Sequence, residues 1–242
     1  MQPAENTAAT LNFDDVKALA SEDMNAVDNL IRSSLQSDVL LVSQVAEYIV
    51  TSGGKRIRPL IVLLAARALG YTGGHQMNAA AIIEFIHTAT LLHDDVVDSS
   101  DRRRGRDTAN TVFGNQASVL VGDFLYSRAF QMMVDIGRMR VMQILADATN
   151  TIAAGEVMQL MNVHDPDVTE AEYRKVIYRK TARLFEAGAQ IAAVHADRDA
   201  SDEAAMVCYG QNLGTDFQLI DDALDYNASP EELGKNLGDD LG

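Results

Sequence analysis

The 242-residue chain has 20 Lys and Arg residues against 35 Asp and Glu residues, which gives a net charge of −15, and 47% of its residues are hydrophobic. This acidity argues against nucleic acid as a partner, because binding to a phosphate backbone requires a basic surface. The length is sufficient for a single domain with a substantial core, which we place over residues 1–242. Ala, Leu, Met and Glu recur at helical spacing, so the sequence predicts an all-α protein.

The sequence contains no recognisable targeting signal or membrane span. Its first 20 residues are acidic and lack the apolar core of a signal peptide, and its first arginine is Arg32. The longest apolar run, Leu60–Ala66, is far shorter than the roughly 20 residues that cross a membrane. The single cysteine, Cys208, cannot form an internal disulfide and is expected to pack as a small apolar residue. We therefore expect a cytoplasmic protein with no integral membrane segment.

Helices are predicted along almost the whole chain after a loose tail at residues 1–10. The predictions rest on apolar spacing and on capping signals, such as Ser21 as an N-cap. In chain order the predicted helices are Leu11–Ala20, Ser21–Leu35, Asp38–Thr51, a helix with Pro59 near its start that ends at Leu69, Met77–Asp98, Asn115–Gly137, Arg138–Met161, a helix that runs to His195, and Ser201–Tyr226. Short polar loops between them predict one bundle without an internal domain boundary.

Local signals refine three parts of this bundle. The polar stretch from Ser99 to Thr111 is expected to be a loop or a loosely wound helix end. Gly122 and Asp123 are expected to interrupt the helix that begins at Asn115. The sequence Thr169-Glu170-Ala171-Glu172 is a capping box, which opens the helix to His195.

The sequence D-D-x-x-D occurs twice, each time at the end of an apolar helical run. The six aspartates are Asp94, Asp95 and Asp98, then Asp221, Asp222 and Asp225. Residues four apart on a helix lie on one face, and three carboxylates so close together repel one another unless a cation or protons neutralise them. Carboxylate oxygens suit Mg²⁺, which is often completed by water and substrate phosphates. Two solvated acidic helix ends are the alternative, but the repetition favours two metal-binding walls that face a diphosphate.

Two basic motifs accompany these clusters. Gly53-Gly54-Lys55-Arg56-Ile57-Arg58-Pro59 places basic side chains at a helix start, where free N–H groups and the dipole attract anions. Arg102-Arg103-Arg104-Gly105 follows the first aspartate cluster and suits fork-like phosphate contacts. A basic capping turn and a solvated basic loop are the respective alternatives.

These motifs, in this order, resemble the trans-polyprenyl diphosphate synthases. The resemblance rests on G-G-K-x-x-R, on L-x-x-D-D-x-x-D with a trailing R-R-G, and on K-T before the second D-D-x-x-D, and it covers about Leu30–Leu241. It implies an isoprenoid-synthase-type helical bundle around a deep central cavity, assembled as a homodimer. The implied activity condenses an allylic diphosphate, such as farnesyl diphosphate, with successive isopentenyl diphosphates. It uses three Mg²⁺ ions and yields an octaprenyl-type product for a quinone side chain.

The resemblance also implies a role for each residue that matches a family motif. The isopentenyl diphosphate would be held by Lys55, Arg58, His87 and Arg104. The Mg²⁺ ions on the allylic diphosphate would be bound by Asp94, Asp95, Asp98, Asp221 and Asp222, with Asp225 less directly involved. The allylic diphosphate would also contact Arg103, Lys180 and Lys235. The oxygen dipoles of Thr181 and Gln218 would stabilise the developing allylic cation. The expected catalytic residues are Asp94, Asp95, Lys180, Thr181 and Gln218.

Product length should depend on how far an apolar tunnel extends below Asp94. The small residues Ala89 and Thr90 precede the first cluster by one turn, where short-chain enzymes that resemble this family usually carry aromatic residues. Tyr126, Phe130 and Met133 share one helix face, and by resemblance Met133 forms or adjoins the tunnel floor. Ordinary core packing explains this stripe equally well.

Three other hypotheses compete with the synthase. Glu84 and His87 form E-x-x-H, a di-iron signature, but none of the other four histidines has Glu three residues before it. A class I terpene cyclase or head-to-head synthase explains the aspartates but not the basic motifs. Relatives are expected to continue for several helices beyond Gly242, so the family's C-terminal helices are expected to be absent here. A truncated, non-catalytic partner subunit of a prenyl synthase therefore stays an alternative.

Overall fold

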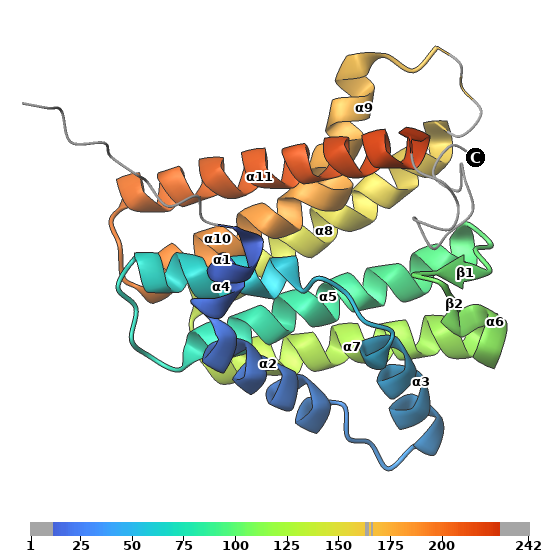
Figure 1. Cartoon of the computed structure of the whole chain (residues 1–242), viewed down its shortest axis with the longest axis horizontal. Helices are drawn as coiled ribbons and strands as arrows, with labels where there is room; N and C mark the ends of the chain where they lie inside the picture. The colour runs from blue at the N-terminus through green and yellow to red at the C-terminus, as the bar shows by residue number, and fades with distance from the viewer. Residues whose placement is uncertain (1–11, 163–164, 166, 228–242) are drawn as a thin grey trace, which may run out of the picture.

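A computed structural model describes residues 12–162, 165 and 167–227 as a bundle of helices (Figure 1). The first helices are α1 (Phe13–Ala18), α2 (Ser21–Ser34), α3 (Leu40–Thr51), α4 (Ile57–Ala68) and α5 (His75–Val97). An antiparallel hairpin of β1 (Arg102–Arg103) and β2 (Arg106–Asp107) follows, and then α6 (Ala109–Phe113) and α7 (Asn115–Ile136). The remaining elements are α8 (Met139–Asn162), α9 (Glu170–Ile177), the π-helix η1 (Tyr178–Ala182), α10 (Arg183–His195) and α11 (Ala200–Asn227). The predicted all-α class is confirmed.

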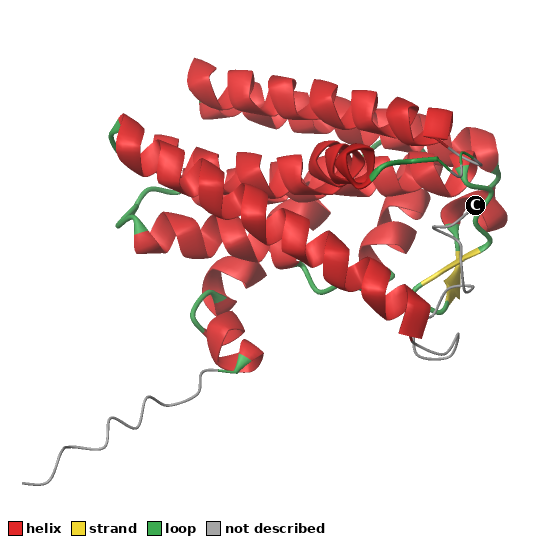
Figure 2. Cartoon of the chain, turned by 90° about the horizontal axis from the view of Figure 1, so that it is seen from above, coloured by secondary structure: helices red, strands yellow, loops and turns green. Residues whose placement is uncertain are grey.

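The direction of two long helices brings the aspartate clusters to one end of the bundle. α5 and α11 run the same way, so their C-terminal ends lie together at the right of Figure 1, beside the β1–β2 hairpin. Figure 2, seen from above, shows the hairpin at that same end of the long helices. Segments far apart in the chain therefore meet where the acidic and basic motifs lie.

The centre of the bundle is α10, which packs against α4, α5, α8 and α11. Every residue of α10 except Val194 is buried, as expected for a helix that is surrounded on all sides. Its two charged residues, Arg183 and Glu186, form an ion pair of 2.8 Å with each other. Small residues allow the close packing: a Cβ on Gly188 would lie 2.9 Å from Val62 Cγ2.

Two glycines of α11 bring it into direct backbone contact with α10. A Cβ on Gly210 would lie 2.6 Å from the Cα of Glu186 and 2.7 Å from the carbonyl oxygen of Phe185. A Cβ on Gly214 would lie 2.6 Å from the Cα of Ala182. One turn further along α11, Gln218 reaches the residues of η1, so this close approach positions the second half of the site.

The expected single helix from the Thr169 capping box to His195 contains a π-helical turn. The capping box itself is confirmed, because Thr169 Oγ1 accepts a hydrogen bond from the Glu172 amide and the Glu172 carboxylate accepts one from the Thr169 amide. The π-turn η1 then covers Tyr178–Ala182. Such turns are frequent at functional sites, and this one carries Lys180 and Thr181. Both residues line the same cavity.

Several local predictions are wrong, each for a structural reason. Gly122 does not interrupt α7; it makes room for a side chain, because a Cβ there would lie 2.3 Å from His93 Nε2. Ser21 is the first residue of α2, whose N-cap is Ala20, and makes no capping hydrogen bond. Cys208 lies on the exposed side of α11. The Ser99–Thr111 stretch contains the β1–β2 hairpin and the start of α6.

The other helix predictions agree with the described residues to within about two residues at each end. The predicted tail at residues 1–10 lies outside the described residues. Within the described ranges, no helix is long and apolar enough to cross a membrane.

The contact between α10 and α11 can be tested by Gly210→Ala. Alanine favours a helix over glycine by about 1 kcal/mol, but overpacking a close contact costs about 1–3 kcal/mol. The new methyl group would meet backbone atoms, which cannot rotate away, so the cost should lie in the upper part of this range. After the gain from alanine is subtracted, we expect a net loss of about 1–2 kcal/mol in the free energy of unfolding. Urea denaturation followed by circular dichroism measures it. Gln211→Ala, at the neighbouring exposed position, should change little. A variant as stable as the parent would show that the two helices can separate without cost.

Candidate active site

Two cavities meet at the end of the bundle where the clusters lie. The first, which we call the polar chamber, has a volume of about 330 Å³ and is lined by residues of α4, α5, the hairpin, α8, η1 and α11. The second, which we call the apolar cavity, has a volume of about 710 Å³ and is lined mainly by α5, α7 and α8. The residues that line both are Thr90, Asp94, Asp98, Glu156 and Lys180. A molecule with a charged head and an apolar tail would fit with its head in the polar chamber and its tail in the apolar cavity.

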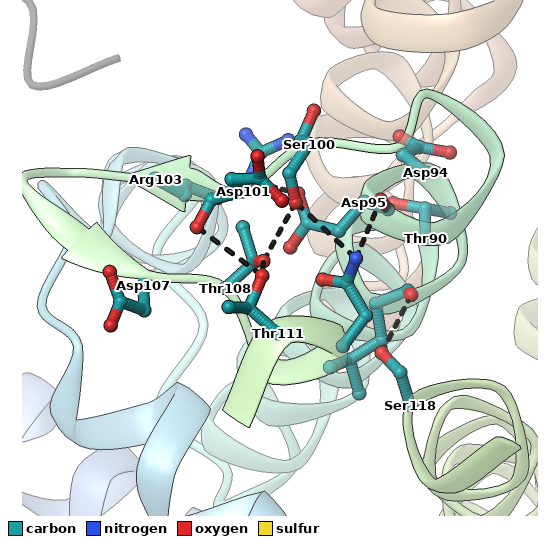
Figure 3. A network of polar contacts seen from close by, with 12 residues as sticks. Thr90, Asp94, Asp95, Ser100, Asp101, Arg103, Asp107, Thr108, Thr111 and Ser118 are labelled. Carbon is teal, nitrogen blue, oxygen red and sulfur yellow. Dashed lines mark hydrogen bonds and ion pairs between the residues drawn. The ribbon is translucent and has the colours of Figure 1, made fainter. Parts of the chain in front are cut away.

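The first aspartate cluster divides between two environments. Asp94 and Asp98 line both cavities, whereas the Asp95 side chain is fully buried and lines neither. Figure 3 shows Asp95 directed toward Ser100 and Arg103, away from Asp94. Its Oδ1 accepts a hydrogen bond of 2.8 Å from Arg103 Nε. The reason is the angle of about 100° between successive helix residues. All three aspartates of this cluster are predicted metal ligands. Asp94 and Asp98 face the chamber, whereas Asp95 is paired with Arg103.

A network of hydrogen bonds fastens the hairpin to the end of α5 (Figure 3). The Thr108 hydroxyl donates to the carbonyl oxygen of Ser100 over 2.7 Å. The Asn110 amide donates to the carbonyl oxygens of Asp95 (3.2 Å) and Ser100 (3.3 Å). These positioning residues could not be recognised from the sequence, because Thr108 is the N-cap residue of α6, a short helix that the sequence did not predict.

The second aspartate cluster divides in the same way. Asp221 and Asp225 line the polar chamber, and Asp222 does not. The Asp222 carboxylate accepts hydrogen bonds from the Tyr173 hydroxyl and from Gln218 Nε2, the latter over 2.7 Å. The chamber therefore has carboxylates on two walls, contributed by α5 and α11.

The acidic walls suit a divalent cation. Among residues 12–162, 165 and 167–227, no group of three or more His, Cys, Asp and Glu side chains is arranged to hold an ion by itself. Burial raises the pKa of Asp94 to about 7; nearby Lys180 opposes this shift, and the negative charges of Glu156 and Asp98 add to it. This concentration of negative charge is what a cation would relieve. A Mg²⁺ ion that takes one or two carboxylates and is completed by water and phosphate fits these donors.

Another part of the polar chamber lining is basic. Arg58, His87 and Arg104 line it, and the Arg58 guanidinium lies 3.1 Å from His87 Nε2. Burial and the neighbouring arginines lower the pKa of His87 well below its usual value, so the ring is neutral and can accept a hydrogen bond from Arg58. The Arg58 guanidinium also lies 4.7 Å from the centre of the Phe185 ring, which fixes its position.

The glycine-rich segment before α4 is fastened to α5 and to the hairpin. Arg56 adopts a left-handed backbone conformation and pairs with Glu84, and both side chains are largely buried. The Arg104 guanidinium donates to the carbonyl oxygen of Gly53. A Cβ on Gly54 would lie 2.7 Å from Arg104 Nη1. Glu84, which the sequence presented only as part of E-x-x-H, therefore has a structural role that could be recognised only in three dimensions.

The remaining predicted residues differ in where they lie. Lys180 lies between the two cavities, 2.9 Å from Glu156 and 3.8 Å from Asp94. Thr181 Oγ1 donates to Gln218 Oε1 over 2.8 Å, and both residues line the polar chamber. Lys55 is exposed and does not line the chamber. Lys235 lies outside the described residues.

The residues expected to control product length are also divided. Thr90, Tyr126 and Phe130 line the apolar cavity. Ala89 and Met133 are fully buried in the main core cluster and do not line it. Both interpretations of the stripe, a tunnel lining and ordinary core packing, therefore apply in part. Tyr126 and Phe130 face the cavity, and Met133 packs in the core.

Comparison with known proteins identifies the relatives of this arrangement. Residues 39–242 match the sequence profile named Polyprenyl synthetase. The chain is 58% identical to octaprenyl diphosphate synthase of Escherichia coli, over 96% of this chain and 72% of that protein. It is 47% identical to the geranyl-diphosphate-specific all-trans-nonaprenyl-diphosphate synthase of Rhodobacter capsulatus, over 94% and 70%.

A solved structure shares the fold and was determined with ligands. It is a polyprenyl synthase from Caulobacter crescentus complexed with calcium and isoprenyl diphosphate. It is similar with a TM-score of 0.91 and 50% sequence identity, over 94% of this chain and 69% of the other. The motifs, the two joined cavities and these similarities lead to one conclusion: the chain belongs to the polyprenyl synthetase family.

Proposed function

We propose that this protein is a long-chain trans-prenyltransferase that condenses an allylic diphosphate, such as farnesyl diphosphate, with successive isopentenyl diphosphates. The observation that carries the proposal is the pair of adjoining cavities, one polar with acidic and basic lining residues and one apolar and larger. An octaprenyl-type diphosphate is the proposed product, supported by 58% identity to an octaprenyl diphosphate synthase. Such a product suits a quinone side chain. Location in the cytoplasm stays a prediction from the sequence.

The basic wall would hold the isopentenyl diphosphate. Arg58 and Arg104 present guanidinium groups, which match phosphate oxygens with two parallel hydrogen bonds. Neutral His87 would orient Arg58 rather than add a positive charge. Lys55 is exposed and does not line the chamber, so its contact with this diphosphate stays a prediction from the resemblance.

The allylic substrate would be held where the two cavities share their lining residues. Arg103 and Lys180 line the polar chamber beside the aspartates and would bind the allylic diphosphate. Asp94 and Asp98, with Asp221 and Asp225 opposite, would hold the proposed Mg²⁺ ions, three by resemblance. When bound, Mg²⁺ would supply Lewis-acid stabilisation of the charge on the departing diphosphate. Asp95 would contribute indirectly, by orienting Arg103.

The cation that forms would be stabilised by oxygen dipoles and protected from water. Thr181 and Gln218 form a hydrogen-bonded pair on the chamber wall, next to Lys180, so their oxygens would face the allylic carbon. The isopentenyl double bond would attack this carbon and form the new C–C bond. The released pyrophosphate would take the proton that is lost. The apolar cavity would receive the growing chain and exclude water that would quench the cation.

Two alternatives make different use of the same site. A truncated, non-catalytic partner subunit would not need the complete polar lining, yet Asp94, Asp98, Asp221 and Asp225 all face the chamber. A terpene cyclase needs only one diphosphate site, and the separate basic wall of Arg58, His87 and Arg104 favours two. Both observations support the synthase.

The synthase proposal predicts that Asp94→Ala abolishes product formation. The purified chain is incubated with Mg²⁺, farnesyl diphosphate and labelled isopentenyl diphosphate, and the dephosphorylated products are sized. We expect a ladder that ends near eight isoprene units, and a loss on the order of a hundredfold or more in Asp94→Ala. Asp135→Ala, an exposed carboxylate on α7, is the matched control. Absence of product from the folded chain, but stimulation of a full-length synthase on mixing, would favour the partner subunit.

Product length should respond to the size of the side chain at position 90, because Thr90 lines both cavities. Thr90→Phe adds a ring where the chain would pass from the polar chamber to the apolar cavity, so we expect shorter products at a similar rate of isopentenyl consumption. Thr90→Val keeps the size of the side chain and serves as the control. Sizing the products by reversed-phase chromatography measures both. Unchanged octaprenyl product in Thr90→Phe would mean that the chain follows another route.

We also propose a homodimer. An exposed apolar strip on α7 supports it: Leu120 and Val134 are 66% and 63% exposed, with Val119 and Phe130 alongside. Exposed apolar patches of this kind mark association surfaces, and a second copy would cover the strip. Leu120→Arg should therefore shift the chain from dimer to monomer in sedimentation velocity experiments, whereas Gln211→Arg, at an exposed polar position of α11, should not. A monomeric parent chain would contradict the proposal.

A further inference from the structure

Glu156 is an acidic residue at the centre of the site that the proposed reaction does not use. It lies on α8 and lines both cavities, beside Lys180. Its position is set by the preceding residue, because a Cβ on Gly155 would lie 2.7 Å from Arg179 Cβ and 3.1 Å from the Lys180 backbone nitrogen. The absence of a side chain at Gly155 thus brings α8 against η1 and places Glu156 beside Lys180.

Lys180 is held by Glu156 more closely than by Asp94. Its Nζ lies 2.9 Å from Glu156 Oε2, which is hydrogen-bond distance, and 3.8 Å from Asp94 Oδ2. The Lys180 and Glu156 side chains are 25% and 29% exposed, so solvent competes only weakly for this pair. An ammonium group has three donors. With one donor on Glu156, two stay available to a diphosphate in the polar chamber.

Removing Glu156 would leave Asp94 as the nearest carboxylate to Lys180. Lys180 Nζ already lies 3.8 Å from Asp94 Oδ2, so the freed ammonium would turn to this oxygen. The resulting pair would occupy an oxygen that the proposed cation needs and would draw the ammonium away from the diphosphate. Glu156 therefore prevents Lys180 from pairing with Asp94, so that Lys180 can bind the diphosphate and Asp94 can bind a cation.

We infer that Glu156 is a positioning residue, which holds the Lys180 ammonium toward the allylic diphosphate and keeps Asp94 available for a divalent cation. The inference rests on the proposed function. It assigns to α8 a part in substrate binding that neither aspartate cluster nor basic motif provides. It also explains why a charged residue lies on the wall of a largely apolar cavity.

Substrate binding without turnover tests this inference directly. Farnesyl diphosphate is titrated into the chain by calorimetry with Mg²⁺ and without isopentenyl diphosphate, so no product forms. In Glu156→Ala, Lys180 would turn to Asp94 and lose its charge-assisted hydrogen bond to the diphosphate. We therefore expect this variant to bind farnesyl diphosphate about tenfold more weakly and to need more Mg²⁺ for half-maximal binding. Binding of isopentenyl diphosphate alone should not change. Asp147→Ala, which removes an exposed carboxylate of α8 that lines neither cavity, is the matched control.

Two further variants separate positioning from a general structural role. Glu156→Gln keeps the volume and one acceptor oxygen, so it should fold normally and weaken binding less than Glu156→Ala. In a Lys180→Met background, Glu156→Gln should cause no further loss, because the group that it positions is gone. Equal losses in both backgrounds, or farnesyl diphosphate binding by Glu156→Ala as tight as that of the parent, would overturn the inference alone. A parent chain that neither binds farnesyl diphosphate nor forms product would overturn the proposed function and this inference with it.

Discussion

The site depends on how negative charge is compensated where the two cavities meet. Asp94, Asp98 and Glu156 converge there, and the lysine that borders both cavities is Lys180. Burial by itself lowers the pKa of Lys180, but the charges of Asp94 and Glu156 outweigh it and the net shift is upward, so the ammonium stays charged. Burial likewise raises the pKa of Glu156, although Lys180 opposes the shift. A cation and a diphosphate would complete this balance.

Close contacts between helices fix the positions of these charged groups. Gly155 brings α8 against η1, and Gly210 and Gly214 bring α11 against α10. The side chains of Lys180 and Thr181 consequently meet partners from two other helices, Glu156 and Gln218. Close backbone contacts resist displacement because packed interiors deform little, which suits a site that we propose aligns two diphosphates.

The two D-D-x-x-D motifs show how helix geometry assigns different tasks to neighbouring residues. In each motif the first and last aspartates face the polar chamber, and the middle one is engaged elsewhere. Asp95 pairs with Arg103 and Asp222 bonds to Gln218. The middle residues thereby orient an arginine and an amide that line the same chamber, so the motif supplies both the proposed metal ligands and their supports.

The sequence by itself determined the helical class, the helix limits to about two residues, the two acidic clusters and the basic motifs, because these depend on local spacing and composition. It also indicated the family. Only the tertiary structure decided that Asp95 and Asp222 turn away from the chamber, that Ala89 and Met133 pack in the core, and that Glu84 pairs with Arg56. It alone revealed Glu156 beside Lys180. These outcomes depend on which helices meet and at what rotation, and contacts between residues distant in the chain determine that.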